Sequence, residues 1–291
     1  PSMLDASSLP SHEPDLSNGE LYFHAGGCAS CHAAPGQKGC DDSTLVRSEE
    51  LAGGRCLKTP FGTFNVPNIS PDKEDGIGDW SDLDFINAMA RGVSPDGAHY
   101  YPAFPYTSYQ RMKLTDLIDL KAYIDQLPKV KSDVPGHDLA LPFQLRRGLG
   151  LWKFLYLDEK PFEVDTSQSG EVIRGAYLTQ GPGHCGECHT PRNLIGGLIR
   201  SKAYSGAKAA EGEGFVPNIT PHGDGLKDWS KEDIAEALKT GFTPSFDTLG
   251  GTMTEVQKNM SKLTDADRLA IGAYLKSVAA FPDSSKGSYS E

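Results

Sequence analysis

Two short motifs of the type Cys-x-x-Cys-His carry the most specific chemistry in the sequence, one at residues 28–32 and one at residues 185–189. A single turn of helix places both thiols at one edge of a porphyrin, where they form thioethers with the vinyl groups. The histidine that follows then ligates the iron from the proximal side. The motifs therefore predict two covalently bound haem c groups. The predicted residues are Cys28, Cys31, Cys185 and Cys188 for attachment, and His32 and His189 as proximal ligands.

Two other kinds of chemistry use paired cysteines, and both fit this sequence less well. In a zinc site the adjacent histidine is usually too strained to join the same tetrahedron. A thioredoxin-like redox pair needs a β-α-β context, and we expect no strand before either motif. Two motifs in matching surroundings favour haem.

The remaining cysteines, Cys40 and Cys56, have no partner motif. They are either two buried thiols or a disulfide. Haem c is usually attached outside the cytoplasm, where disulfides persist, so we predict a bridge between them. Such a bridge closes a loop of about 15 residues and contributes about 3 kcal/mol of stability by chain entropy. It would hold the Gly- and Asp-rich segment Gly36–Gly54, and an unbridged Cys56 would instead be a conceivable iron ligand.

The two halves of the chain match beyond the haem motifs. Both carry a Val-Pro-Asn-Ile sequence, an Asp-Trp-Ser sequence and a later Leu-Thr-Asp sequence. The distance from Trp80 to Leu114 is 34 positions, and that from Trp229 to Leu263 is also 34. We therefore interpret the chain as a tandem duplication of one haem-binding domain.

Local signals place the helices that follow each motif. Serine after each tryptophan is a good N-cap, and acidic residues occupy the first turn. These signals predict helices at residues 82–91 and 231–240, each ended by a glycine. Closing helices begin near the Leu-Thr-Asp sequences, and short helices lead into the haem motifs.

The predicted fold class is all-α, with two tandem class I cytochrome c-like domains that contain much loop. Residues 17–128 form the first domain and residues 169–282 the second. Residues 1–16 are expected to be a flexible N-terminal arm, and residues 283–291 a flexible tail. Between the domains, residues 129–168 are rich in apolar side chains, so we predict a packed strap with a short helix at Phe143–Leu155 rather than a loose linker. The alternative is a single additional helix in one domain.

The second axial ligand decides between an electron carrier and a catalyst, because methionine closes the site and raises the potential. In the second half, Met253 lies in a Gly-rich loop that can cover the distal face, and we favour it. Met260 is the alternative, although a methionine near a helix is also a common packing residue.

The first half is less regular. Phe104 takes the position of Met253 when the halves are aligned on Leu114 and Leu263. Met112, just before the closing helix, is the favoured ligand. His99 would give bis-histidine ligation, and an open site is a further alternative.

Composition limits the kinds of partner. The chain of 291 residues has 28 basic and 39 acidic residues, a formal net charge of −11. No basic run suggests nucleic-acid binding, and an acidic surface suits a partner with a basic docking face. No apolar stretch approaches the ~18–20 residues of a membrane span. We expect a periplasmic protein whose signal peptide has been removed.

Four segments carry a family resemblance: Val66–Ile69, Trp80–Ser81, Tyr101–Tyr106 and His184–Asn193. They resemble the cytochrome c subunits of membrane-associated alcohol, gluconate and related sugar dehydrogenases. The similarity covers residues 17–280. It implies that electrons come from a dehydrogenase subunit and leave to quinone, a terminal cytochrome or an oxidase. Family members commonly have methionine where Phe104 stands, and they commonly carry three haems rather than two.

The resemblance also suggests that Arg192 pairs with a haem propionate, although an exposed arginine without a specific role is equally simple. The function predicted from the sequence is a periplasmic diheme cytochrome c that transfers single electrons between a dehydrogenase, or another quinol-oxidising donor, and a respiratory acceptor. The alternative is an enzyme, thiosulfate dehydrogenase-like or peroxidase-like, with the first haem as catalytic site. A haem-based gas sensor would need a signalling domain, which we do not recognise in the sequence.

Covalent attachment is tested by mass. The denatured protein is expected to exceed the polypeptide mass by two haems, with no link that a thiol reagent can reduce. A chain that carries one haem, or none, would contradict the assignment of both motifs.

Overall fold

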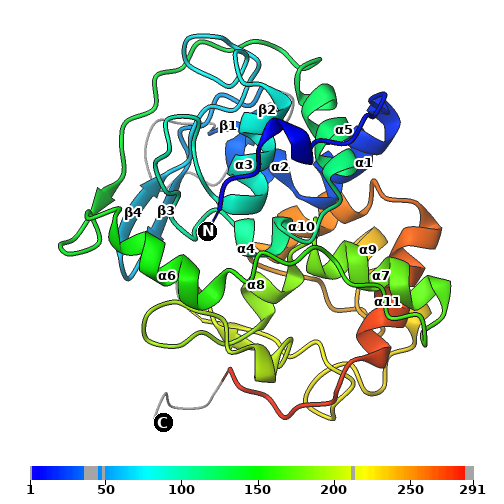
Figure 1. The fold of residues 1–291 in the computed structure, drawn as a ribbon. Helices are drawn as coiled ribbons and strands as arrows, with labels where there is room; N and C mark the ends of the chain where they lie inside the picture. Colours follow the sequence, from blue (N-terminus) through cyan, green and yellow to red (C-terminus); the bar gives the residue numbers. More distant parts are fainter. Residues whose placement is uncertain (1, 36–44, 48–49, 211–213, 286–291) are drawn as a thin grey trace. The chain divides into compact units, whose positions relative to one another are not determined.

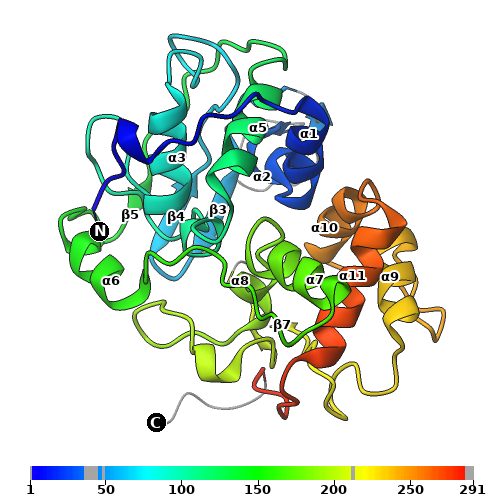
Figure 2. The ribbon, with the colours of Figure 1, turned by 45° about the vertical axis from the view of Figure 1, so that its right-hand side comes forward.

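The structure is a computed structural model that describes residues 2–35, 45–47, 50–210 and 214–285. Its Cα positions group into two compact units, Pro1–Pro161 and Phe162–Glu291. Figures 1 and 2 show the ribbon from two directions. Each unit is described below by itself.

The first unit is built around two helices, α1 (Leu16–Ala25) before the haem motif and α5 (Leu114–Ile124) after it. Helix α1 packs along α5 at Gly19, where an added Cβ would lie 2.2 Å from the carbonyl oxygen of Asp119. Only glycine permits this approach of two helix backbones. The elements of this unit are η1 Ala6–Ser8, α1 Leu16–Ala25, α2 Cys28–His32, β1 Ala34–Pro35, β2 Leu45–Arg47, β3 Cys56–Thr59, β4 Gly62–Asn65, α3 Asp82–Arg91, α4 Tyr106–Tyr109, α5 Leu114–Ile124, β5 Asp138–Leu139 and α6 Gly148–Tyr156.

The second unit contains the corresponding helix pair. Helix α7 packs along α11, and a Cβ on Gly175 would lie 1.8 Å from the carbonyl oxygen of Ala270. Figure 2 shows α9 beside the same α11. The elements of this unit are α7 Gly170–Gln180, α8 Cys185–His189, η2 Arg200–Lys202, β6 Ala207–Lys208, β7 Phe215–Val216, α9 Lys231–Thr240, α10 Met253–Met260 and α11 Asp265–Ser277.

The predicted helices at residues 82–91 and 231–240 are confirmed as α3 and α9. Ser81 and Ser230 are the N-caps, and each forms a reciprocal capping box with an aspartate three residues later. Gly92 and Gly241 end the helices in the left-handed conformation, which glycine adopts without steric cost. Local chemistry therefore determined both ends of each helix.

The prediction of an all-α fold is corrected by small β-sheets. In the first unit, β3 and β4 form an antiparallel hairpin, and β5 adds to β4 as a third strand. Short antiparallel pairs β1–β2 and β6–β7 follow the haem motifs. Strand β5 lies within the segment predicted as a strap. Its pairing with β4, which is far away in the sequence, attaches the strap to the first unit. The fold is mostly helical, with much loop and a few strands.

The helix predicted in the strap is α6, and it begins later than predicted, at Gly148. A buried lysine on this helix attaches it to the end of α3. The Lys153 ammonium donates hydrogen bonds to the carbonyl oxygens of Gly92 and, at 3.0 Å, of Arg91, where α3 ends. It lies 4.8 Å from the centre of the Tyr106 ring. Burial lowers the pKa of Lys153 to about 8. This cation caps the end of α3, where the carbonyl groups lack helical partners.

The N-terminal arm, predicted to be flexible, is held at two points. The Leu4 amide donates to Asn87 Oδ1 at 2.8 Å, and Asn87 Nδ2 donates back to the Leu4 carbonyl at 3.1 Å. His12 Nε2 lies 2.6 Å from Asp119 Oδ1. The described part of the predicted tail is also bound, because the Ser284 amide donates to the Ser205 carbonyl at 2.8 Å. The polar composition of these segments gave no indication of these specific hydrogen bonds.

The close contact of α7 with α11 can be tested by adding one methyl group. Gly175→Ala is expected to lower the free energy of unfolding by about 1–3 kcal/mol, because the helix backbones must separate. Gly170→Ala is the matched control, since no atom lies within 4 Å of its added Cβ. The control is expected to change stability by less than about 1 kcal/mol. Thermal or denaturant unfolding of the holoprotein checks both, and equal effects of the two variants would contradict the packing argument.

Candidate haem sites

Each Cys-x-x-Cys-His motif forms one turn of helix, α2 in the first unit and α8 in the second. The residue before each turn is in the left-handed conformation, Gly27 with φ 59° and His184 with φ 37°. Desolvation of the first thiol of each motif raises the pKa of Cys28 and of Cys185 to about 12. Two thiols on one helical turn, followed directly by an imidazole, fit the requirements of thioether attachment.

The first proximal histidine is fixed by its own main-chain partner. His32 Nδ1–H donates a hydrogen bond to the Pro67 carbonyl oxygen at 2.8 Å. Burial lowers the pKa of His32 to about 4, although the bond to Pro67 acts in the opposite direction. The ring is therefore neutral at ordinary pH, with its proton on Nδ1. This leaves the lone pair of Nε2 for a metal ion.

The second motif repeats this arrangement. His189 Nδ1–H donates to the Pro217 carbonyl oxygen at 2.7 Å. Burial lowers the pKa of His189, and the hydrogen bond to Pro217 again opposes the shift. A second-shell carbonyl of this kind orients a metal-ligating imidazole and increases its basicity. The donor set of both motifs fits haem iron.

A glycine supports the backbone of each proximal histidine. The Gly53 amide donates to the His32 carbonyl at 2.7 Å, and the Gly206 amide donates to the His189 carbonyl at 2.9 Å. Both glycines have positive φ, 68° and 89°. A Cβ on Gly53 would lie 2.5 Å from the Pro67 carbonyl carbon, so a side chain there would disturb the group that holds the imidazole.

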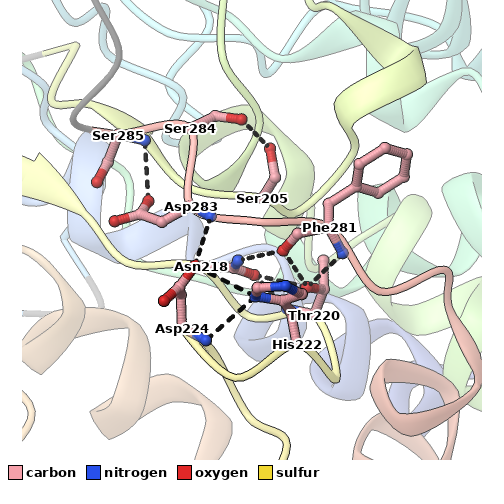
Figure 3. Close-up of polar contacts among 9 residues, drawn as sticks. All are labelled: Ser205, Asn218, Thr220, His222, Asp224, Phe281, Asp283, Ser284 and Ser285. Atoms are coloured by element: carbon pink, nitrogen blue, oxygen red, sulfur yellow. Dashed lines mark hydrogen bonds and ion pairs between the residues drawn. The ribbon is translucent and has the colours of Figure 1, made fainter.

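An asparagine after each proline anchors the same loop to the chain that follows the closing helix. In the second unit, Asn218 Nδ2 donates to the Phe281 carbonyl at 2.7 Å, and Asn218 Oδ1 accepts from the Thr220 amide at 2.8 Å (Figure 3). In the first unit, Asn68 Nδ2 donates to the Val130 carbonyl at 2.7 Å. Each loop is thus connected in the same way to the segment that follows the closing helix of its own unit.

Further polar contacts secure this region of the second unit. Figure 3 shows the Asp283 amide donating to Asp224 Oδ2 at 3.2 Å and the Ser205 and Ser284 hydroxyls 2.9 Å apart. Ser205 directly precedes Gly206, which supports His189. The described residues after α11 therefore help to fix the proximal side of the second site.

On the distal side of the first site, the structure separates the two candidate ligands. Met112 is buried and follows α4, whose Tyr109 hydroxyl lies 3.5 Å from the Gly26 carbonyl, beside the first motif. His99 Nδ1 lies 3.1 Å from the Lys153 ammonium and accepts its hydrogen bond. His99 is thus engaged with the strap helix, whereas the segment before Met112 reaches the haem motif.

In the second site, the two methionines lie at opposite ends of α10. Met253 is the first residue of this helix and is half-buried, whereas Met260 is the last and is buried. The Met260 methyl group lies 3.5 Å from the position of a Cβ on Gly183, two residues before Cys185. This contact places Met260 beside the second motif. Both ligand assignments remain predictions.

Arg192 binds within the second motif itself. Its Nη2 lies 2.6 Å from Glu187 Oε2 and 3.0 Å from the Glu187 carbonyl oxygen, and its Nη1 donates to the Gly196 carbonyl at 2.8 Å. The Glu187 side chain is buried, so the pair stabilises a carboxylate inside the predicted attachment turn. A propionate contact by Arg192 remains a prediction. Cys40, the predicted partner of Cys56, lies outside the described residues.

Comparison with known proteins identifies the family. The family model named cytochrome c matches residues 16–128. A diheme cytochrome c-type protein of Cereibacter sphaeroides is 51% identical over 267 residues, which cover 91% of this chain and 86% of the relative. This chain belongs to the cytochrome c family. Its role is electron transfer, and haem c is the cofactor of the family.

Larger relatives of this cytochrome are dehydrogenase subunits. The fructose dehydrogenase cytochrome subunit of Gluconobacter japonicus is 36% identical over 277 residues, 94% of the cytochrome and 54% of that subunit. The cytochrome c subunit of an alcohol dehydrogenase (quinone) from Gluconobacter oxydans is 33% identical over 286 residues, which cover 96% of the cytochrome and 58% of that subunit. The cytochrome thus spans little more than half of these two relatives. Among its described residues, no helix is long and apolar enough to cross a bilayer.

Sequence reasoning had not assigned a role to the prolines that hold the proximal histidines. The signal was present, because Pro67 and Pro217 occupy the same place in the two Val-Pro-Asn-Ile sequences. It had also missed Glu187 as the partner of Arg192. The sequence does show an acidic residue between the two attachment cysteines, and this residue was the signal for a charged partner.

The Arg192–Glu187 pair predicts a shift in redox potential. Arg192→Gln removes a positive charge next to the second motif and leaves the nearby carboxylate, so oxidised iron is favoured there. The potential of that haem is expected to fall by on the order of 30 mV. Glu187→Gln is the control of opposite sign. Redox titration followed in the visible spectrum measures both, and shifts of the same sign would contradict a charge effect.

Proposed function

We propose that this cytochrome is a periplasmic diheme carrier that takes single electrons from a dehydrogenase and passes them to a downstream respiratory acceptor. The observation that carries the proposal is the repeated proximal arrangement, in which His32 and His189 each bond a proline carbonyl at 2.8 Å and 2.7 Å. Bound haem supplies reversible one-electron chemistry, and two like centres in one chain suit stepwise transfer.

The tandem architecture is part of this proposal. Each unit contains a helix before the motif, a glycine contact with a closing helix and an asparagine that anchors the proline loop. These shared features support the duplication of one ancestral domain. We also propose that both cysteines of each motif form thioethers with a haem. The Cereibacter relative is named as a diheme protein, which also supports two haems. We include the Cys40–Cys56 bridge, since the periplasm permits disulfides.

The proposed sixth ligands are Met112 and Met253. Hydrogen bonding of His99 to Lys153 favours Met112 over His99 in the first site. For the second site we propose Met253, which begins α10 directly after the Gly-rich loop, with Met260 as the alternative. Thioether ligation of both irons would give closed, low-spin centres at raised potential, which suits an electron carrier.

The proposed donor is a dehydrogenase subunit, since several relatives are named as cytochrome subunits of fructose, alcohol and gluconate dehydrogenases. The net charge of −11 would steer the cytochrome towards basic faces on its redox partners. A terminal cytochrome or oxidase is the proposed acceptor.

Removal of each methionine tests the ligands separately. Met253→Ala is expected to open only the second haem to carbon monoxide and to lower its potential by on the order of 100 mV. Met112→Ala should do the same at the first haem. Met260→Ala is the control. It should reduce stability but leave the visible spectrum of both haems unchanged and neither haem open to carbon monoxide. If Met112→Ala leaves the spectrum unchanged, His99 becomes the leading ligand.

The unaltered holoprotein provides the decisive measurement for the carrier function. It is expected not to bind carbon monoxide and not to turn over thiosulfate or peroxide. Rapid binding or turnover by the unaltered protein would show an open first haem and would overturn the carrier assignment.

A further inference from the structure

The strap segment 141–155 exposes an unusual number of large apolar side chains. Phe154 is 80% exposed, Leu141 74%, and Leu145 and Leu151 are each 67% exposed. Phe143 and Leu155 are exposed as well. These six residues, here called the strap face, lie within one short stretch of chain. So many exposed apolar side chains in one short segment make it a candidate interaction site.

The charge of the same stretch is opposite to that of the chain. Residues 139–157 contain no aspartate or glutamate and three cations, whereas the whole chain carries −11. Lys153 is buried beneath the helix, and Arg146 and Arg147 are exposed at its start. Arg146 also lies over the Tyr101 ring, 5.3 Å from its centre. The strap face is therefore both apolar and basic, and it suits an anionic surface.

The strap face belongs to a well-anchored element. The Tyr101 hydroxyl donates to the Phe143 carbonyl at 2.8 Å, and Lys153 fastens α6 to the end of α3. Trp152 packs edge-on against Tyr106, with ring centres 6.4 Å apart. Figure 2 labels α6 and the short strand β5 that precedes it in the chain. Binding would therefore require little ordering of the backbone, so less of the binding energy is lost.

We propose that the strap face is a docking surface for an anionic lipid bilayer. Exposed leucines and phenylalanines beside arginines are the composition of interfacial helices, which lie in the headgroup region without spanning the membrane. Leucine dominates the strap face, whereas it is under-represented among the residues that carry the energy of protein interfaces. The two arginines would attract lipid phosphates despite the acidic remainder of the chain.

The experiment uses the full holoprotein and vesicles of equal parts phosphatidylcholine and phosphatidylglycerol, with pure phosphatidylcholine vesicles for comparison. Sedimentation, read by haem absorbance, is expected to show binding to the anionic vesicles that weakens from about 0.05 M to about 0.5 M salt. Phe154→Glu and Leu145→Glu are each expected to lower the affinity about tenfold or more, because they place a charge at the interface.

Phe246→Glu is the matched control, since this phenylalanine is 90% exposed but belongs to the second unit. It should bind as the unaltered protein does. Absence of binding to anionic vesicles, or equal binding by Phe154→Glu, would overturn the proposal. So would failure of Phe154→Cys to react with a hydrophilic maleimide, which would show that the face is covered within the molecule. None of these outcomes bears on electron transfer, which is tested separately by carbon monoxide and turnover.

Discussion

The hydrogen bond from each proximal imidazole to a proline carbonyl is the constraint that the rest of each unit serves. At 2.8 Å for His32 and 2.7 Å for His189, it fixes the ring orientation and leaves Nε2 without a proton. Proline suits this role because it has no amide hydrogen of its own to satisfy, and its ring restricts the backbone. The carbonyl therefore stays where the histidine needs it.

A second set of contacts holds that carbonyl in place. Gly53 and Gly206 support the histidine backbone, and Asn68 and Asn218 bind the chain beyond the closing helix. The closing helix in turn packs against the helix that leads into the motif, through a glycine that permits backbone contact. The loop that holds each imidazole is consequently connected to the segment after the closing helix, and through that helix to the one that leads into the motif.

How far the sequence predicts this structure depends on how local each determinant is. The helices α3 and α9 follow from serine caps and glycine stops within a few residues, and they were predicted to their ends. The addition of β5 to β4 joins residues far apart in the chain, so no local pattern announces it. The hydrogen bonds between the Leu4 main chain and the Asn87 side chain also join distant residues, and no local pattern predicts them. The partner of Arg192 is near in sequence, but it becomes evident only once the motif turn brings Glu187 beside it.

The two units agree on the proximal side and differ on the distal side. After the histidine, both use the same proline, asparagine and closing helix. Before the closing helix, the first unit has the short α4 among aromatic rings, including Phe104 packed against Tyr109 with ring centres 5.7 Å apart. The second unit has the longer α10 in a more exposed region. Axial ligand, solvent access and local dielectric set the potential of a haem. The proximal frames are alike apart from the Arg192–Glu187 pair at the second motif. We therefore expect any difference in potential between two bound haems to arise from that pair and from these distal segments.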